Sequence, residues 1–434
     1  MKVAVVGMGP AGLRTMMLLK KSGHDVHGFE ARDRVGGRLK TIRTEAGFYE
    51  GGGEWIDADH HRLIALLKEL GQSPVIADLY PGMVWMAGKA YVEDEYQEHQ
   101  AVLDRVEEAA DQLALDLDDV PWNNVLYANL DSQTLGGWLD QQAGRASIPR
   151  RILESVYRSD EGEDTHEVGL LGWLCARLAY LERTGGEMSS ARFPQGAQGF
   201  CEAMADQCGP ITFGAALQQV TINGSEIGLT FNSEEPKWFD RVVLAIPAGC
   251  LRDITFEPGI SEAKQAAFEA ARMSRTIKVS LHFDAKFWTG SSRTLTDGLL
   301  QQAWSAQDPN SELQTPMYTL LTYIGGQAAI DLALMGEEAA GRTLLAELEQ
   351  VHPGAKDHYT GATLHDWVHD DFAGGGFFCL PPGYVLDHYE ALVRPENGLY
   401  FAGDYGGRWI GTIEGALESA ERVTEDINLA SHIH

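Results

Sequence analysis

The stretch KVAVVGMGPAG, residues 2–12, specifies the start of an α/β fold. Apolar residues typical of a buried strand lead directly into the pattern G-x-G-x-x-G, and a helix is expected to follow over Leu13–Lys20. In this pattern Gly7 permits the tight turn, Gly9 lets a pyrophosphate approach the backbone, and Gly12 lets the helix pack on the strand. The arrangement is typical of a turn that binds the phosphates of a dinucleotide.

The residues around this turn complete the pattern. Pro10 and Ala11 lie where the helix begins, so its free N–H groups and the positive end of its dipole face the phosphates. A second strand over Asp25–Phe29 ends at Glu30, where an acid can hold a ribose hydroxyl. Strand, glycine turn, helix and acid in this order predict a Rossmann-like domain that binds an ADP-containing dinucleotide.

The composition is that of a globular protein with a strong excess of acidic residues. A length of 434 residues allows two or three domains, and the formal charge of −29 argues against nucleic acid and anionic membranes as partners. The 5 cysteines are scattered without a C-x-x-C pattern, which fits reduced thiols better than disulfides or a zinc site. Because the first strand begins at residue 2, no signal peptide is expected, and we expect a soluble protein of the cytoplasm.

The order of the predicted elements indicates a nucleotide domain assembled from the beginning, the middle and the end of the chain. Strands return over 211–247, where Asn223-Gly224 is expected to form a hairpin turn, and other strands are expected over 274–283 and 316–333. A helix is expected over Glu337–Val351. The predicted fold is α/β, with the nucleotide domain over 1–75, 205–255 and 385–434, and an inserted α+β substrate domain over 76–204 and 256–384, of which 95–185 is largely helical.

The segment ARDRVGGR, residues 31–38, follows Glu30 directly and indicates which dinucleotide is bound. It resembles the second fingerprint of the flavin-containing amine oxidases, the monoamine and polyamine oxidase family, in which R-x-G-G-R follows the ribose acid. In physical terms, paired glycines let the backbone approach a flavin, and Arg38 places fixed positive charge on the diphosphate. The resemblance implies an FAD-binding domain of the glutathione reductase type, with Ala31, Arg32, Gly37 and Arg38 beside the cofactor.

Further stretches resemble the same family in the same order, so the resemblance covers nearly the whole chain. EGGGEWI at 50–56 resembles the glycine turn along the flavin, and Val220 falls where the family's adenine-side contact lies. Trp367 begins a W-x-x-D region, and 401–404 with 409–416 resemble the C-terminal flavin motif. The cofactor-binding residues implied by these stretches are Gly52, Gly53, Glu54, Trp55, Val220, Trp367, Gly403, Asp404, Gly411, Thr412 and Ile413.

The segment 273–283 resembles the family's catalytic-lysine strand. Lys278 lies there among alternating apolar residues, and burial disfavours the charged form of an amine. The resemblance implies that Lys278 holds a water near flavin N5 and takes part in substrate deprotonation or oxygen activation. The implied reaction is hydride transfer from the α-carbon of an amine to flavin N5, followed by imine hydrolysis and re-oxidation by molecular oxygen to give hydrogen peroxide.

Two departures from the family bear on the cofactor and the substrate. Gly375 occupies the place of the cysteine to which many members attach FAD, so FAD is expected to be non-covalent. The two aromatic residues that flank the amine in the family correspond to Gly376 and Thr412, so we expect an open site. Such a site suits a bulky or unusual amine or an amino-acid-derived metabolite. Trp409 remains, and Phe377, Phe378 or Tyr405 is a candidate to replace the missing aromatic rings.

Other charged residues leave alternatives open. Glu54 either pairs with a cationic substrate or binds the backbone, and an amino acid substrate would need an arginine such as Arg177 or Arg192 for its carboxylate. No metal site is expected, because a third ligand is lacking for the histidines that are candidate ligands: His60, His61, His365 and His369.

Two rival functions compete with amine oxidation. An FAD-dependent desaturase or oxidase of C–C bonds, resembling the phytoene desaturase and protoporphyrinogen oxidase branch, is disfavoured by Lys278. A binding protein without redox chemistry, resembling the GDP-dissociation inhibitors, has little use for Glu30, Arg38 and Asp404 together. The expected partners are a small-molecule amine and molecular oxygen, with no nucleic acid and no membrane, and a homodimer is left open.

Overall fold

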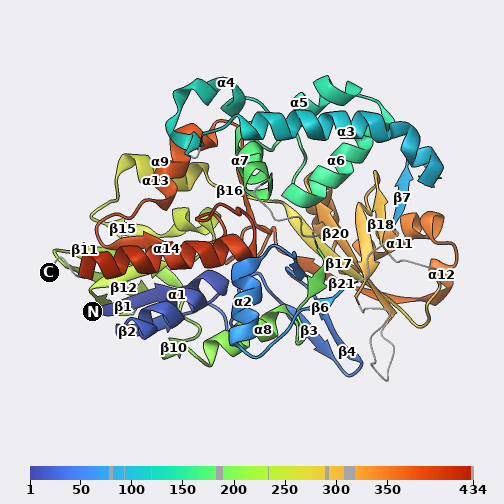
Figure 1. The fold of residues 1–434 in the computed structure, drawn as a ribbon. Helices are drawn as coiled ribbons and strands as arrows, with labels where there is room; N and C mark the ends of the chain where they lie inside the picture. The colour runs from blue at the N-terminus through green and yellow to red at the C-terminus, as the bar shows by residue number, and fades with distance from the viewer. Residues whose placement is uncertain are drawn as a thin grey trace.

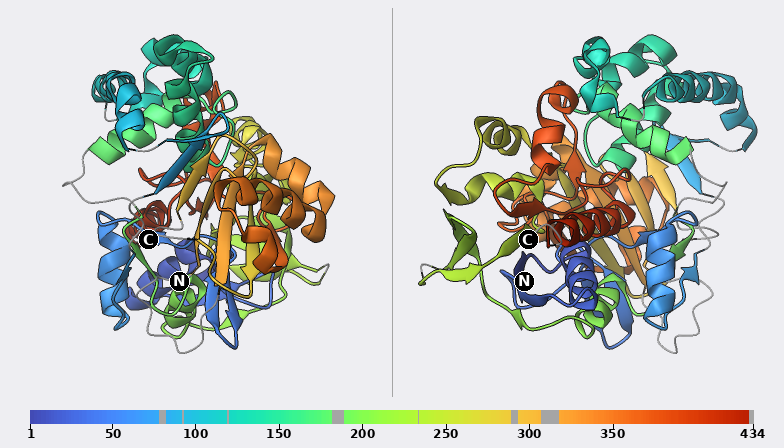
Figure 2. Two further views of the ribbon diagram at one scale, coloured as in Figure 1. Left: turned by 90° about the vertical axis from the view of Figure 1, so that its right-hand side faces the viewer. Right: turned by 60° about the vertical axis from the view of Figure 1, so that its left-hand side comes forward.

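The computed structural model describes residues 1–77, 82–91, 93–118, 120–181, 189–232, 234–288, 293–306 and 318–431, with the side chains of 93–96 left aside. Two halves, each built on a sheet, lie side by side beneath a layer of helices (Figure 1). The same arrangement is visible after rotation of the molecule (Figure 2). This mixed α/β architecture is the fold class that the sequence predicts.

The first half is built on a parallel sheet with the strand order β10-β2-β1-β14-β23. Strand β1 (Lys2–Val6) is central, and Val3–Val6 are buried on both faces, as is typical of parallel strands. Helices α1 (Pro10–Lys21) and α14 (Ile413–Ser431) pack against each other beside this sheet. The other strands are β2 (Asp25–Phe29), β10 (Ile211–Thr212), β14 (Arg241–Leu244) and β23 (Leu399–Phe401).

A smaller sheet of order β13-β12-β11-β15 belongs to the same half. Asn223 and Glu226 pair across the turn between β11 and β12, and Gly224 has a positive φ of 63°. This confirms the predicted Asn-Gly hairpin, whose left-handed turn residue favours glycine. The strands are β11 (Leu217–Asn223), β12 (Glu226–Phe231), β13 (Lys237–Phe239) and β15 (Thr255–Glu257).

The second half is built on a sheet with the order β21-β17-β20-β19-β18-β7-β8. The strand expected over 316–333 is shorter, because β20 covers Tyr318–Gly325 and Gly326 then begins helix α10 (Gln327–Met335); 316 and 317 lie outside the described residues. Helix α11 (Glu337–Val351) has the predicted bounds. The other strands are β7 (Met83–Met86), β8 (Lys89–Tyr91), β17 (Thr276–Phe283), β18 (Thr294–Thr296), β19 (Gln302–Ser305) and β21 (Tyr359–Asp366).

The helical layer covers the top of both halves in Figure 1. The described parts of 95–185, which are 95–118 and 120–181, are largely helical as predicted. Their helices are α3 (Glu93–Leu115), α4 (Ala128–Asp131), α5 (Leu135–Leu139), α6 (Ile148–Glu161) and α7 (Leu170–Leu181). Within the described residues, no helix combines the length and apolarity needed to cross a membrane.

The remaining strands form small sheets of two or three strands. The remaining helices are α2 (His61–Glu69), α8 (Ala197–Ala205), α9 (Glu262–Ala270), α12 (Ala355–His358) and α13 (Glu390–Val393). The strands are β3 (Thr41–Thr44), β4 (Gly47–Glu50), β5 (Trp55–Ile56), β6 (Val75–Ile76), β9 (Ala191–Arg192), β16 (Arg272–Met273) and β22 (Phe378–Cys379).

Candidate active site

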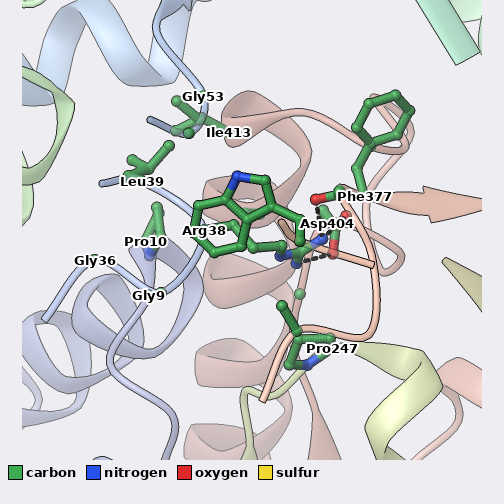
Figure 3. A pocket seen from close by; sticks show the side chains of 18 of the residues that line it. Gly9, Pro10, Gly36, Arg38, Leu39, Gly53, Pro247, Phe377, Asp404 and Ile413 are labelled. Carbon is green, nitrogen blue, oxygen red and sulfur yellow. Dashed lines mark hydrogen bonds and ion pairs between the residues drawn. The ribbon is translucent and has the colours of Figure 1, made fainter. Parts of the chain in front are cut away.

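A cavity of about 530 Å³ lies at the carboxyl ends of β1 and β2 and extends to the seven-stranded sheet. The carboxyl edge of a parallel sheet is the usual ligand-binding place in open α/β folds. Figure 3 shows part of its lining, from Gly9 and Pro10 on one side to Phe377 on the other. The sequence-predicted residues that line it are Gly7, Gly9, Pro10, Ala11, Glu30, Ala31, Arg32, Gly37, Arg38, Gly52, Gly53, Glu54, Trp55, Lys278, Trp367, Gly376, Phe377, Gly403, Asp404, Gly411, Thr412 and Ile413.

The glycine turn at one end of the cavity is closely packed. Gly7 has a φ of 98°, and its N–H donates to the carbonyl of Phe29 at 2.8 Å. A Cβ on Gly12 would lie 1.9 Å from the carbonyl oxygen of Gly7, so Gly12 serves the packing of α1 and does not line the cavity. A Cβ on Gly9 would meet only the Gly36 carbonyl oxygen at 3.9 Å. Gly9 therefore leaves open space beside the N-terminus of α1.

The acid expected at the ribose is held by backbone groups. The Glu30 carboxylate accepts hydrogen bonds from the N–H of Met8 at 2.8 Å and of Arg32 at 3.0 Å. It is buried at the end of β2 and lines the cavity. Arg32 forms an ion pair with Asp370, and its guanidinium lies 5.3 Å from the ring centre of Phe372. The nucleotide end of the cavity thus has fixed polar groups.

Arg38 and Asp404 join segments that are far apart in the sequence. Two guanidinium nitrogens of Arg38 donate to the Asp404 carboxylate at 2.7 and 2.8 Å, and one also donates to the Gly376 carbonyl at 3.1 Å (Figure 3). Asp404 also accepts from the N–H of Phe378 at 2.9 Å. Burial opposes the charge on Arg38, but Asp404 outweighs it and raises the pKa of Arg38. This bidentate pair fixes the C-terminal motif against the second fingerprint.

The turn after Glu50 passes close to the same arginine. A Cβ on Gly52 would lie 2.0 Å from the carbonyl oxygen of Arg38, so glycine is needed for this approach. The indole N–H of Trp367 donates to the carbonyl of Gly51 at 2.8 Å and ties the W-x-x-D region to the turn. At the other side, Thr412 precedes α14, and its hydroxyl accepts from the N–H of Gly415 at 3.0 Å. A second helix N-terminus therefore faces the cavity.

Lys278 occupies the wall that β17 contributes to the cavity. It is only 5% exposed, and its ammonium donates to the carbonyl oxygens of Gly52 at 2.7 Å and Glu50 at 3.4 Å. It also donates to Glu54 Oε2 at 3.1 Å. The expected buried lysine is thus in contact with the glycine turn that the family resemblance places along the flavin.

Glu54 is buried and engaged with three side chains. Besides Lys278, Glu54 contacts Arg192 at 3.6 Å and accepts from the indole N–H of Trp304 at 2.5 Å. The guanidinium of Arg192 also lies 4.4 Å from the ring centre of Trp55. The carboxylate of Glu54 thus binds side chains of the protein itself, which was neither of the two alternatives left open for it.

The substrate end of the cavity is lined by side chains that sequence reasoning missed. These residues come from separate segments: Asp57, His60, Ser159, Asp160, Tyr180, Arg293, Gln302, Trp304 and Tyr323. Of these residues, only Tyr323 had a signal that could have identified it. Tyr323 pairs directly with Lys278 across neighbouring strands, so the two side chains point to the same face of the sheet. The others depend on how the helical layer sits on the sheet.

One of the two positions of the missing aromatic pair, Gly376, is closely packed. A Cβ on Gly376 would lie 1.8 Å from the hydroxyl oxygen of Thr276, so no larger side chain fits without rearrangement. Phe377 lines the cavity and lies 3.1 Å from the place of a Cβ on Gly411. Trp409 does not line the cavity, but its ring contacts those of His60 and Tyr180, which do.

Val220 lies away from the cavity. Its side chain is fully buried in the core, and the nearby residues that line the cavity are Ala215, Ala216 and Leu217. The strand has a register irregularity between Leu217 and Gln219, which changes the faces that side chains occupy.

The candidate metal ligands are dispersed. Within the described residues, no group of three His, Cys, Asp or Glu side chains is placed to hold a metal ion. His365 is buried beside β17, where burial and then the charges of Lys40 and Lys278 lower its pKa to about 3. His365 is therefore neutral, and it packs under Gly51, where a Cβ would lie 2.9 Å from its ring.

One cavity is surrounded by a nucleotide turn, a second helix N-terminus and a buried lysine. This combination is typical of an enzyme that binds a dinucleotide. The chain matches the model of the family described as flavin containing amine oxidoreductase over residues 10–428. The protein therefore belongs to this family, and it is an FAD-dependent amine oxidase. This confirms the resemblance and the cofactor predicted from the motifs.

Individual relatives are distant in sequence but similar along their length. The human amine oxidase [flavin-containing] B is 25% identical, over 98% of this chain and 85% of its own. A probable flavin-containing monoamine oxidase A of Dictyostelium discoideum is 23% identical, over 98% and 97%. Among solved structures, a wild-type putrescine oxidase bound to putrescine has a TM-score of 0.88 at 22% identity, and a cyclohexylamine oxidase from Brevibacterium oxydans IH-35A has 0.87 at 24%, each covering 99% of both chains.

The residues around the cavity fit FAD. The open space at Gly9 is a cradle that a Cβ would fill, and two helix N-termini offer N–H groups to phosphates. Glu30 supplies a fixed carboxylate, and Arg38 supplies a fixed guanidinium on the wall of the same cavity. The glycine turn, Glu30, Arg38 and the start of α14 all line this cavity, and their chemistry fits the cofactor.

Proposed function

We propose that this enzyme oxidises an amine at its α-carbon, with hydrolysis of the imine and re-oxidation by molecular oxygen to hydrogen peroxide. When bound, FAD supplies the acceptor for the hydride equivalent. The residues of the chain bind the amine, orient its α C–H bond and exclude water. The observation that carries this proposal is the Lys278 ammonium, 2.7 Å from the Gly52 carbonyl on the wall of the cavity that the cofactor motifs line.

The surroundings of Lys278 support a role in holding a water molecule. An ammonium has three N–H donors, and Lys278 has three oxygen acceptors, from Gly52, Glu54 and Glu50. The contact to the Glu50 carbonyl is the longest at 3.4 Å, so a bridging water replaces it at the smallest loss. In this proposal Lys278 is catalytic, and Glu54 positions it.

The form of the substrate end supports a bulky or unusual amine, or an amine derived from an amino acid. Gly376 and Thr412 leave out the aromatic pair, while Phe377 remains on the wall. Arg177 binds Glu107 and Asp111 and does not line the cavity, so we do not assign it to a substrate carboxylate.

We also propose that FAD is bound without a covalent link. Cys379 is buried in β22, and Cys250 is the cysteine that lines the described part of the cavity. Burial raises the pKa of the Cys250 thiol to about 11, with Arg38 opposing the shift. A thiol with this pKa is a poor nucleophile near neutral pH. Acid precipitation should therefore release the yellow cofactor into solution, whereas colour in the pellet would show covalent attachment.

Anaerobic titration of the purified protein with amines and amino acids tests the reaction class. Bleaching of the oxidised flavin band by amines is the expected result, and peroxide and an aldehyde or ketone should appear when oxygen is admitted. A band that no amine bleaches would favour the oxidation of C–C bonds instead. A protein that cannot be loaded with FAD would favour a binding protein.

A further inference from the structure

Three elements bring polar side chains together around Lys278 on the cavity wall. Glu54 directly precedes β5, Trp304 belongs to β19, and Lys278 belongs to β17. All three residues line the cavity and are nearly buried, with exposed fractions of 3%, 5% and 5%. A buried carboxylate and a buried indole N–H both need partners, and here each supplies the partner of the other.

The carboxylate of Glu54 is held at both of its oxygens. Oε2 accepts from the Lys278 ammonium at 3.1 Å, and Oε1 accepts from the indole N–H of Trp304 at 2.5 Å. A carboxylate bound at one oxygen can still turn about its terminal bond, because the potential of that torsion is broad. Binding at both oxygens fixes the plane of the group, so the hydrogen bond from Trp304 keeps Oε2 directed at Lys278.

Arg192 supplies charge to the same carboxylate without replacing this hydrogen bond. Its guanidinium lies 3.6 Å from Oε1 of Glu54, which is longer than a hydrogen bond. The same guanidinium donates to the carbonyls of Ser305 at 2.9 Å and Ala306 at 3.0 Å, and these contacts hold it in place. Trp304 is therefore the short, directional donor to Oε1.

The position of Glu54 matters because it affects the orientation of the Lys278 ammonium. Lys278 also donates to the carbonyl oxygens of Gly52 at 2.7 Å and Glu50 at 3.4 Å. The three N–H groups of an ammonium stand at fixed angles to one another, so a shift of Glu54 turns the other two donors as well. The ring centre of Trp304 lies 5.4 Å from the same ammonium, so the indole is next to the group that it helps to orient.

We propose that Trp304 is a positioning residue for the reaction and that it acts on Lys278 through Glu54. This inference rests on the proposed function, in which Lys278 is catalytic. The indole N–H holds the carboxylate of Glu54, and the carboxylate holds the ammonium in the orientation that the reaction needs. Trp304 itself exchanges no proton and no electron with the substrate.

Trp304→Phe tests the inference, because it removes the indole N–H and keeps an aromatic ring on the wall. This variant should slow the same flavin half-reaction that Lys278→Met slows, by roughly 10-fold, since a misplaced catalytic group loses part of its effect. Rapid mixing measures flavin reduction by an amine and, after photochemical reduction without amine, re-oxidation by oxygen. The amine concentration that gives the half-maximal rate of reduction should stay within about 3-fold of wild type.

Double variants show whether the residues act as a unit. In the Lys278→Met background, Trp304→Phe should slow the same half-reaction by less than about 2-fold, because the group that it positions is gone. Glu54→Gln is a second single variant, because an amide offers one acceptor oxygen where the carboxylate offers two. It should also slow that half-reaction, and again by less than about 2-fold when Lys278 is already replaced.

Trp288→Phe is the matched control. Trp288 is a buried tryptophan that packs against Phe283 and Phe287 and does not line the cavity. Its replacement should leave both half-reactions within about 2-fold of wild type. Flavin absorbance and thermal unfolding establish that each variant is folded and loaded.

Three results would overturn the inference. They are unchanged rates in Trp304→Phe, a change in the amine concentration alone, and equal slowing by Trp304→Phe or Glu54→Gln with and without Lys278. Unchanged rates in Lys278→Met would also overturn it, because no catalytic lysine would then be positioned. A protein that no amine reduces would instead overturn the proposed function.

Discussion

The two ends of the cavity are built differently. At the nucleotide end, glycines and backbone groups form the wall, and the charged side chains are already paired, as Arg38 is with Asp404 and Glu30 is with backbone N–H groups. At the substrate end, side chains from separate segments form the wall, and they include Asp160 and Arg293, whose charges interact. The nucleotide end therefore depends on local motifs and is preorganised, whereas the substrate end depends on how separate segments pack together.

This contrast has consequences for mutation. A change at the nucleotide end breaks packing, leaves a partner charge unpaired or fills space that the cofactor needs, so it should cost stability, cofactor or both. A change at the substrate end removes a group that the folded protein holds at some cost, so it should alter rates while the fold persists. The following substitutions separate these two behaviours.

The largest effect is expected from Gly12→Ala. Its Cβ would lie 1.9 Å from the carbonyl oxygen of Gly7, so we expect a loss of at least about 3 kcal/mol of stability and little folded protein. Gly9→Ala is the matched variant, because its Cβ would meet only the Gly36 carbonyl oxygen at 3.9 Å. It should fold and fail to retain FAD. Circular dichroism and flavin absorbance measure the two properties, and equal behaviour of the variants would contradict the account.

Arg38→Ala should have the next largest effect. It leaves Asp404 buried without its bidentate partner, which typically costs about 3–5 kcal/mol, and it removes the fixed charge beside the cofactor. Thermal unfolding and FAD content should both fall, and Arg38→Lys should recover only part of each because lysine cannot form the fork. Full FAD content in Arg38→Ala would show that the cofactor does not depend on this pair.

Lys278→Met should leave the cofactor in place and slow the chemistry. Arg192 and Trp304 still contact Glu54 in this variant, so the fold should persist. We expect flavin reduction or re-oxidation to fall by about 100-fold in rapid-mixing measurements. Lys286→Met is a matched control, because Lys286 is exposed and does not line the cavity. Unchanged rates in Lys278→Met would remove Lys278 from the catalytic role.

The smallest effect is expected on the stability of Asp160→Asn. The pKa of Asp160 is raised from 3.8 to about 7 by burial, so the folded state binds this proton more tightly than the unfolded state. Stability therefore falls as the pH rises from about 4 to about 7, and the asparagine variant lacks this loss. Its melting temperature should exceed that of wild type by roughly 1 to 3 °C at pH 8 and by less at pH 5. A melting temperature below that of wild type at pH 8 would show that Asp160 is paired in the folded protein.

The nucleotide end was largely predictable from the sequence because its requirements are local. Glycine at positions 7, 9 and 12 follows from backbone approach, and the bounds Asp25–Phe29 of β2 follow from a short apolar strand that ends in an acid. The order of the motifs also predicted that Arg38 and Asp404 lie at one cofactor site, and the two residues form an ion pair. Val220 does not line the cavity, and the irregularity of register that precedes it is not visible in any local sequence pattern.

The substrate end was poorly predictable because it depends on tertiary packing. Asp160 and Tyr180 reach the cavity only because α6 and α7 sit on the sheet, and acidic residues on surface helices usually face water. The expected strand over 316–333 failed for a related reason, since the apolar residues of α10 pack against β17 and β20 as a helix. Lys278 was the exception, because apolar residues alternate regularly along its strand. Both faces of that strand are buried, so a buried position was expected for Lys278.

The most direct test of the account is anaerobic rapid-mixing reduction of the bound flavin by an amine that the titration identifies, compared with the same amine deuterated at its α-carbon. We predict slower bleaching of the flavin band by the deuterated amine, because the α C–H bond breaks as the hydride equivalent leaves. If bond breaking limits the rate of flavin reduction, equal rates for the two forms of the amine would contradict the assignment of amine oxidation. Reduction of the flavin by a substrate without an amino group would also contradict it.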